Sequence, residues 1–105
     1  MVDPYVREYP SPSGAYLVRT VDNEVKMSHW ISAAVLLDAA GAELFDFGSS
    51  WSADTVRWID DSHVELAMRH YPGDRDATLV VDVAARTAIA NGSTLTFAEL
   101  LRWMS

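Results

Sequence analysis

The chain of 105 residues contains no cysteine. This absence excludes disulfide bonds, a thiolate nucleophile and Cys-ligated zinc together. It is typical of a reducing compartment, so we expect a cytoplasmic protein. The first eight residues have neither a basic region nor an apolar segment, and we expect no signal peptide there. No apolar run approaches the roughly 20 residues that span a bilayer, so we expect no membrane partner.

Basic residues are scarce. Lysine occurs once, as Lys26, and seven arginines are scattered among 15 acidic residues, which gives a formal net charge of −7. Phosphate binding needs clustered Lys and Arg, so nucleic acid is not an expected partner. An acidic surface keeps a protein in solution, and it also suits a basic protein partner.

Motifs for catalysis and cofactor binding are also missing. The sequence has no Gly-rich phosphate loop, no Gly-x-Ser-x-Gly elbow and no His-Glu-x-x-His motif. The three histidines, His29, His63 and His70, are the obvious general bases. His63 and Glu65 share one predicted strand face with Arg69 and could form a small polar site, but we favour a solvated face there. Asp74-Arg75-Asp76 lacks the other ligands of a calcium loop. We therefore predict a non-enzymatic protein without cofactor or metal.

The residues that are present indicate a β-rich protein with a single core. Half of them are hydrophobic, and the length suits one domain, 1–105. Three β-segments, Val56–Asp60, His63–Tyr71 and Ala77–Val83, are joined by polar turns. In His63–Tyr71 apolar and polar residues alternate, which predicts a half-buried strand. Ala77–Val83 is a continuous apolar run, which predicts a central strand buried on both faces.

The N-terminal half adds more β-segments. Residues 1–13 carry three prolines and predict an extended arm that is not a central strand. Ala15–Val21 is a strand candidate. His29–Asp38 would permit a helix, but we favour a strand because a hairpin then joins it to Ala42–Phe47. Asn91-Gly92 predicts a second tight hairpin, since both residues tolerate positive φ.

The C-terminal segment, 96–104, is the clearest helix. Thr96-Phe97-Ala98-Glu99 has the pattern of a capping box. One apolar stripe then follows at helical spacing, comprising Phe97, Leu100, Leu101 and Met104, with Trp103 at its edge. We predict an antiparallel meander or sandwich-like sheet of about six or seven strands over residues 15–95. The helix should pack on this sheet.

Two stretches suggest an internal repeat. Ser11–Val18 can be aligned with Ser52–Ile59 at an offset of 41, and Leu36–Asp38 with Val80–Asp82 at an offset of 44. A period near 40 is typical of propeller blades. Ser11-Pro12-Ser13-Gly14 and Trp51-Ser52-Ala53-Asp54 resemble the opening of WD40-like propeller repeats, whose blades often begin with Ser-Pro-Asp-Gly.

This resemblance implies blade-like antiparallel sheets. The sequence departs from the pattern at Ser13, which replaces the Asp, and at Ala53 and Thr55, which replace the Pro and the Gly. Two blades cannot close a ring of the usual four to eight. The chain is therefore expected to be either half of an oligomeric assembly or, as we favour, a small sheet or sandwich that only shares blade-like hairpins with propellers.

Tryptophan is abundant, with four copies. We predict that Trp51, in a loop between serines, and Trp103, on the helix edge, face a partner together with His63 and Glu65. The leading hypothesis is a protein-interaction module, in its most concrete form a small acidic inhibitor or immunity-type protein with a basic partner. The alternatives are a small-molecule-binding domain or minor enzyme, with a Trp/His-lined pocket near His29 or His70, and the oligomerising module. Monomer and homodimer both stay open.

Overall fold

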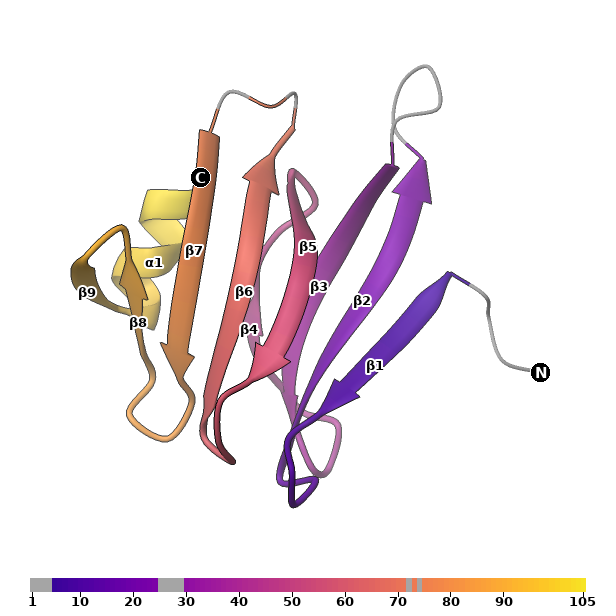
Figure 1. Ribbon diagram of the computed structural model, residues 1–105, viewed down its shortest axis with the longest axis vertical. Coiled ribbons are helices and arrows are strands. Elements are labelled where there is room, and N and C mark those ends of the chain that lie inside the picture. The colour runs from indigo at the N-terminus through magenta and orange to yellow at the C-terminus, as the bar shows by residue number, and fades with distance from the viewer. Residues whose placement is uncertain (1–4, 25–29, 72, 74) are drawn as a thin grey trace.

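The computed structural model describes residues 5–24, 30–71, 73 and 75–105. Nine strands form two antiparallel sheets, and a single helix ends the chain (Figure 1). The predicted mainly β fold with a C-terminal helix is confirmed. The strands outnumber the expected six or seven because the proline-rich arm and the segment after Asn91-Gly92 also pair.

The first sheet has the order β1-β2-β3-β4, with bounds β1 Val6–Pro10, β2 Tyr16–Glu24, β3 Trp30–Asp38 and β4 Glu43–Asp46. The arm contributes its edge strand, as its prolines predict. The strand favoured over a helix at 29–38 is confirmed from Trp30 onward, and His29 lies outside the described residues. The hairpin to β4 is also confirmed: Asp38 Oδ1 accepts the amides of Ala40 and Ala42, each at 2.9 Å.

The second sheet has the order β5-β6-β7-β8-β9, with bounds β5 Trp51–Trp58, β6 His63–His70, β7 Arg75–Asp82, β8 Thr87–Ala90 and β9 Ser93–Thr96. The alternation in β6 is as predicted. β7 is central as predicted, but its burial on both faces is wrong. Leu79 and Val81 are buried, whereas Thr78 is exposed and Val80 half-buried. An antiparallel sheet can leave one face in water.

Strand β5 begins five residues before the predicted segment at Val56. The register shifts between Ala53 and Thr55, where a β-bulge interrupts the pairing with β6. A bulge inserts one extra residue and so breaks the alternation of period two that reveals a strand in the sequence. Trp51–Asp54 is therefore part of a strand and not the opening turn that the propeller-like alignment implied.

The C-terminal region follows its local signals. Asn91 and Gly92 have φ of 50° and 86° and form the two-residue hairpin between β8 and β9. The helix α1, Phe97–Met104, has both bonds of the capping box. It contacts β8 and β9, as expected for docking on the sheet. Leu100 and Met104 are buried, but Leu101 is 57% exposed. This part of the predicted stripe is wrong because the helix contacts the sheet along one side only.

The two sheets meet where β3 and β5 lie side by side (Figure 1). β4 pairs only with residues 35–37 of β3, which leaves the first half of β3 to adjoin β5. The amide of Ser32 donates to Ser52 Oγ at 3.0 Å across this junction. Farther along, Trp58 Nε1 donates to the carbonyl of Tyr9 at 2.7 Å. A single core cluster draws on both sheets and on α1.

Only part of the proposed repeat has a structural counterpart. The offset of 44 aligns the β3–β4 hairpin with the β7–β8 hairpin, which hold equivalent places in their sheets. Asp38 and Asp82 each end a strand. In the turn that follows, Asp38 accepts two backbone amides and Asp82 accepts one. The offset of 41 aligns β2 with β5, the second strand of one sheet with the first of the next. That alignment is not a structural repeat.

Candidate functional site

Trp51 is not on the surface. It begins β5 instead of lying in a loop, and it is 1% exposed. Its Nε1 donates to the carbonyl of Met104 at 2.7 Å. The expectation that Trp51 faces a partner is therefore corrected, because an indole that is buried and hydrogen-bonded offers no surface for binding.

Trp103 packs against the same tryptophan. The two rings are stacked with centroids 5.7 Å apart, and the Arg75 guanidinium lies 4.7 Å from the Trp103 ring and 5.1 Å from the Trp51 ring. Arg75 Nη2 also donates to the carbonyl of Trp103 at 2.9 Å. We call Trp51, His70, Arg75 and Trp103 the aromatic clamp, since they fasten the end of α1 to the second sheet. A partner-binding role for the half-buried Trp103 stays a prediction.

His63 and Glu65 each have a different partner. Glu65 pairs with Arg57 at 3.2 Å. His63 Nδ1 lies 2.8 Å from Asp60 Oδ1, and its Nε2 lies 3.3 Å from Asp82 Oδ2. The hydrogen bond with Asp60 raises the pKa of His63 above its ordinary value. The backbone amide of Ser62, followed by the His63 side chain, lowers the pKa of Asp60. His63 therefore stabilises the turn between β5 and β6. Its role in partner binding stays a prediction.

A pocket lies at the junction of the two sheets. Its volume is about 140 Å³, and it is lined by Trp30 and Ile31 of β3, Ser52 of β5, Arg69 and His70 of β6, and Tyr71 and Gly73 beyond that strand. Trp30 is 46% exposed at the pocket and stacks on Tyr5 with ring centroids 5.5 Å apart. The alternative hypothesis expected a Trp/His-lined cavity near His29 or His70: Trp30 and His70 line this pocket, and His29 lies outside the described residues.

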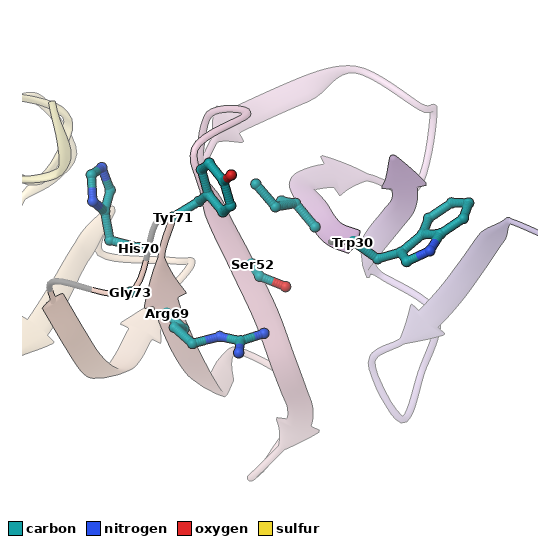
Figure 2. A pocket seen from close by; sticks show the side chains of 7 residues that line it. Trp30, Ser52, Arg69, His70, Tyr71 and Gly73 are labelled. Carbon is teal, nitrogen blue, oxygen red and sulfur yellow. The ribbon is translucent and has the colours of Figure 1, made fainter. Parts of the chain in front are cut away.

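The side chains around the pocket point in different directions (Figure 2). Arg69 extends past Ser52 across the front of β5, and the hydroxyl of Tyr71 points toward the Trp30 side. The His70 ring is turned away from Ser52 and lies 4.9 Å from the Trp51 ring, so it belongs to the aromatic clamp. The polar side chains that face the hollow are therefore Arg69, Ser52 and Tyr71.

The charge in the pocket is positive although the protein is acidic. Among the lining residues that the structure describes, Arg69 carries the only permanent charge. Its side chain is 54% exposed, and Nη2 lies 3.4 Å from Asp54 Oδ1. That separation is longer than the 2.7–2.9 Å of a strong charged hydrogen bond. Ser52 is buried and accepts the Ser32 amide, so its hydroxyl hydrogen can still be donated.

Sequence reasoning missed Trp30, Ser52, Arg69 and Tyr71 as site residues. Arg69 lies on the solvated face of its strand, as expected. No pattern in the neighbouring sequence indicates that β3 adjoins this face. Trp30 begins a strand, where the alternation pattern is shortest and says least about exposure. Trp30 and the turn-rich segment 71–76 would indicate a pocket together, but the sequence does not show that they are neighbours in the fold.

Other kinds of site find little support in the part of the chain that the structure covers. Over residues 5–24, 30–71, 73 and 75–105, no group of three or more His, Asp or Glu side chains could hold a metal ion. The helix described here is too short to cross a membrane. Comparison with protein-family models, curated proteins and solved structures gives no match.

Proposed function

We propose that the protein is a non-enzymatic binding domain that holds a small molecule in the pocket at the sheet junction. The observation that carries this proposal is the pocket itself, built from two sheets and bordered by the half-exposed Trp30. Ligand sites combine apolar and aromatic walls with a few oriented polar groups. Here Ile31 and Trp30 supply apolar surface, and Arg69 and Ser52 supply donors.

The size of the pocket supports a small ligand over a protein surface. Its volume of about 140 Å³ is close to the ~150 Å³ of an engineered apolar cavity that takes up benzene. A basic partner would place Lys or Arg side chains near Arg69, where like charges repel. The pocket therefore favours the small-molecule hypothesis over the basic-partner hypothesis.

The test is a titration of the ¹⁵N-labelled protein with single-ring compounds, one each that is neutral, cationic and anionic. We expect at least one compound to shift the amide resonances of Ile31, Ser52 and Gly73. Trp30→Ala should weaken that binding about three- to tenfold, since an aromatic contact contributes about 0.5–1.5 kcal/mol. Ile89→Ala is the matched control: Ile89 is also 46% exposed but does not line the pocket. If none of the compounds shifts the pocket amides, the proposal is wrong.

A second candidate is the interaction with a basic protein, at a different surface. Three carboxylates, from Asp60, Asp82 and Glu65, lie on or beside the strand that carries His63. Within the described part of the chain, their ion-pair partners are His63 and Arg57. Charge steering by such a surface is screened by salt. A partner captured from a lysate of the native cell at low salt should leave the protein at high salt. Capture that resists salt would contradict this candidate.

The propeller-like module is the third candidate. Two successive antiparallel meanders with equivalent β3–β4 and β7–β8 hairpins support it. A ring would require several copies of the chain, since two blades cannot close one. Sedimentation of the purified protein tests this directly: a closed oligomer is the expected result, and a monomer at all concentrations would dispose of the candidate.

A further inference from the structure

Arg69 distinguishes the junction pocket from the rest of this acidic molecule. It is one of the described residues lining the pocket, and Asp54, the carboxylate that pairs with it at 3.4 Å, does not line that pocket. A guanidinium presents five N–H donors in a rigid fork that matches a carboxylate bidentately. One contact of 3.4 Å to Asp54 leaves most of this capacity unused by the described residues.

The neighbours of Arg69 suit the rest of a small acid. Ser52 can donate a hydroxyl hydrogen beside the guanidinium, and the two side chains lie close together in Figure 2. Ile31, which is buried, and the Tyr71 ring also line the pocket and offer apolar surface. A ligand with a carboxylate at one end and a planar or short apolar body would use both kinds of surface.

We infer that the ligand of this pocket carries a carboxylate, which Arg69 binds with help from Ser52. This rests on the proposed function, because it names the chemical class that the same pocket takes. Asp54 is then the internal competitor for the guanidinium. It lies in the bulge of β5, between the residues where the register shifts, and a ligand carboxylate would replace its long contact with a shorter bidentate pair.

The experiment compares benzoate with benzamide, its neutral counterpart of nearly equal shape, by the same amide titration. Benzoate should bind at least about tenfold more tightly than benzamide. The reason is that hydrogen bonds between charged groups are roughly twice as strong as neutral ones. Arg69→Gln should reduce benzoate binding about tenfold to the benzamide level and leave benzamide unaffected. Asp54→Asn should tighten benzoate binding about two- to fivefold, because the competitor is removed.

Arg57→Gln is the matched control. Arg57 is also an exposed arginine of the second sheet with a carboxylate partner, Glu65, but it does not line the pocket. Its loss should leave benzoate binding unchanged. Urea unfolding of each variant shows whether the fold is retained, and Arg69→Lys, which keeps the charge without the fork, provides a second variant. We expect Arg69→Lys to recover only part of the benzoate affinity.

A chain-terminal carboxylate has the same chemistry as a free acid. N-acetylphenylalanine presents the carboxylate on a peptide backbone, so tighter binding of this compound than of benzoate would identify a chain terminus, and the reverse a free small acid. Either result supports the inference. Equal binding of benzoate and benzamide to the pocket would overturn it while the small-molecule function stands. If the cationic ring compound alone shifts the pocket amides, this inference fails while the small-molecule function stands. If no compound of any charge shifts them, both proposals fail.

Discussion

Arg69 of β6 and Arg75 of β7 lie on neighbouring strands and differ in what surrounds them. Arg75 lies over the rings of Trp51 and Trp103 and donates to a backbone carbonyl at 2.9 Å. Arg69 lines a pocket with Trp30, is 54% exposed, and has a carboxylate at 3.4 Å. Arg75 is held by rings and a backbone carbonyl of the fold, whereas the contact of Arg69 with Asp54 is long and exposed.

The difference shows that residue type alone does not mark a site. In the aromatic clamp the indole of Trp51 is buried and its N–H is satisfied by the Met104 carbonyl. At the pocket Trp30 keeps nearly half of its surface in water. Burial and satisfied hydrogen bonds make a cluster structural, whereas exposure and spare donors leave it available for binding. This contrast can be tested by substitution.

The largest expected effect is the loss of Trp51. Trp51→Ala should lower the free energy of unfolding by about 3–5 kcal/mol, because it leaves a cavity in the core. Trp51→Phe keeps most of the ring and removes the bond to Met104, at a cost of about 1–3 kcal/mol. Trp30→Ala should cost about 1 kcal/mol or less. Urea unfolding of the three variants measures this order, and equal losses at Trp30 and Trp51 would remove the contrast.

The arginines should follow the same order. Arg75→Ala removes a hydrogen bond and a cation–π contact and should cost about 1–2 kcal/mol. Arg69→Ala breaks an exposed ion pair and should change stability by less than about 0.5 kcal/mol. The near-ultraviolet circular dichroism of the stacked tryptophans should change with Arg75→Ala only. A change of similar size with Arg69→Ala would show that the pocket and the clamp are coupled.

The N-cap of α1 provides a smaller perturbation that is confined to the clamp side. Thr96→Ala removes the hydroxyl that accepts the Glu99 amide at 3.2 Å, and a lost cap costs about 1 kcal/mol. Thr96→Ser keeps an accepting hydroxyl and should be nearly neutral. Binding at the pocket should be the same in both variants, since α1 does not line it. Weaker binding in Thr96→Ala alone would indicate that the helix supports the pocket.

The smallest effect concerns pH and the exposed pair of His63 and Asp60. Because the pKa of His63 is raised in the folded state, its stabilising contribution is complete below its ordinary pKa of about 6.5. That contribution is lost as the pH rises through the higher, folded-state value. Asp60, whose pKa is lowered from 3.8, stays ionised throughout this window.

We therefore expect the wild-type protein to lose stability relative to His63→Gln between pH 5.5 and pH 8.5. Thermal unfolding of both proteins at the two pH values gives this difference, in which other titrating groups cancel. The effect should shrink in high salt, since the pair is exposed to solvent. Parallel behaviour of the two proteins would show that this ion pair contributes nothing.

Several features could be predicted because they depend on residues that are close in the sequence. The capping box joins Thr96 to Glu99, and the Asn91-Gly92 turn needs only two residues that accept positive φ. The alternation in His63–Tyr71 reports the buried face of β6 directly. In each case the interaction that fixes the conformation lies within one turn or one strand, so the local pattern carries enough information.

The predictions that failed concern features that depend on contacts between residues far apart in the sequence. A bulge at Asp54 interrupts the alternation of apolar and polar residues, so the pattern does not show where β5 begins. The burial of Trp51 depends on the Met104 carbonyl, which is 53 residues away. The burial of β7 on both faces was wrong because an apolar run does not say which side of a sheet another layer covers.

The sequence by itself determined the mainly antiparallel β fold, the hairpins, the capped helix and the acidic charge, since propensity, turn chemistry and composition act locally. The tertiary structure alone decided which tryptophan is buried and that a pocket exists. Ile31 and Arg69 lie in different sheets, and only the contact of β3 with β5 brings them together. A pocket made by two sheets has no period and no motif in the chain, because its geometry arises from packing between segments.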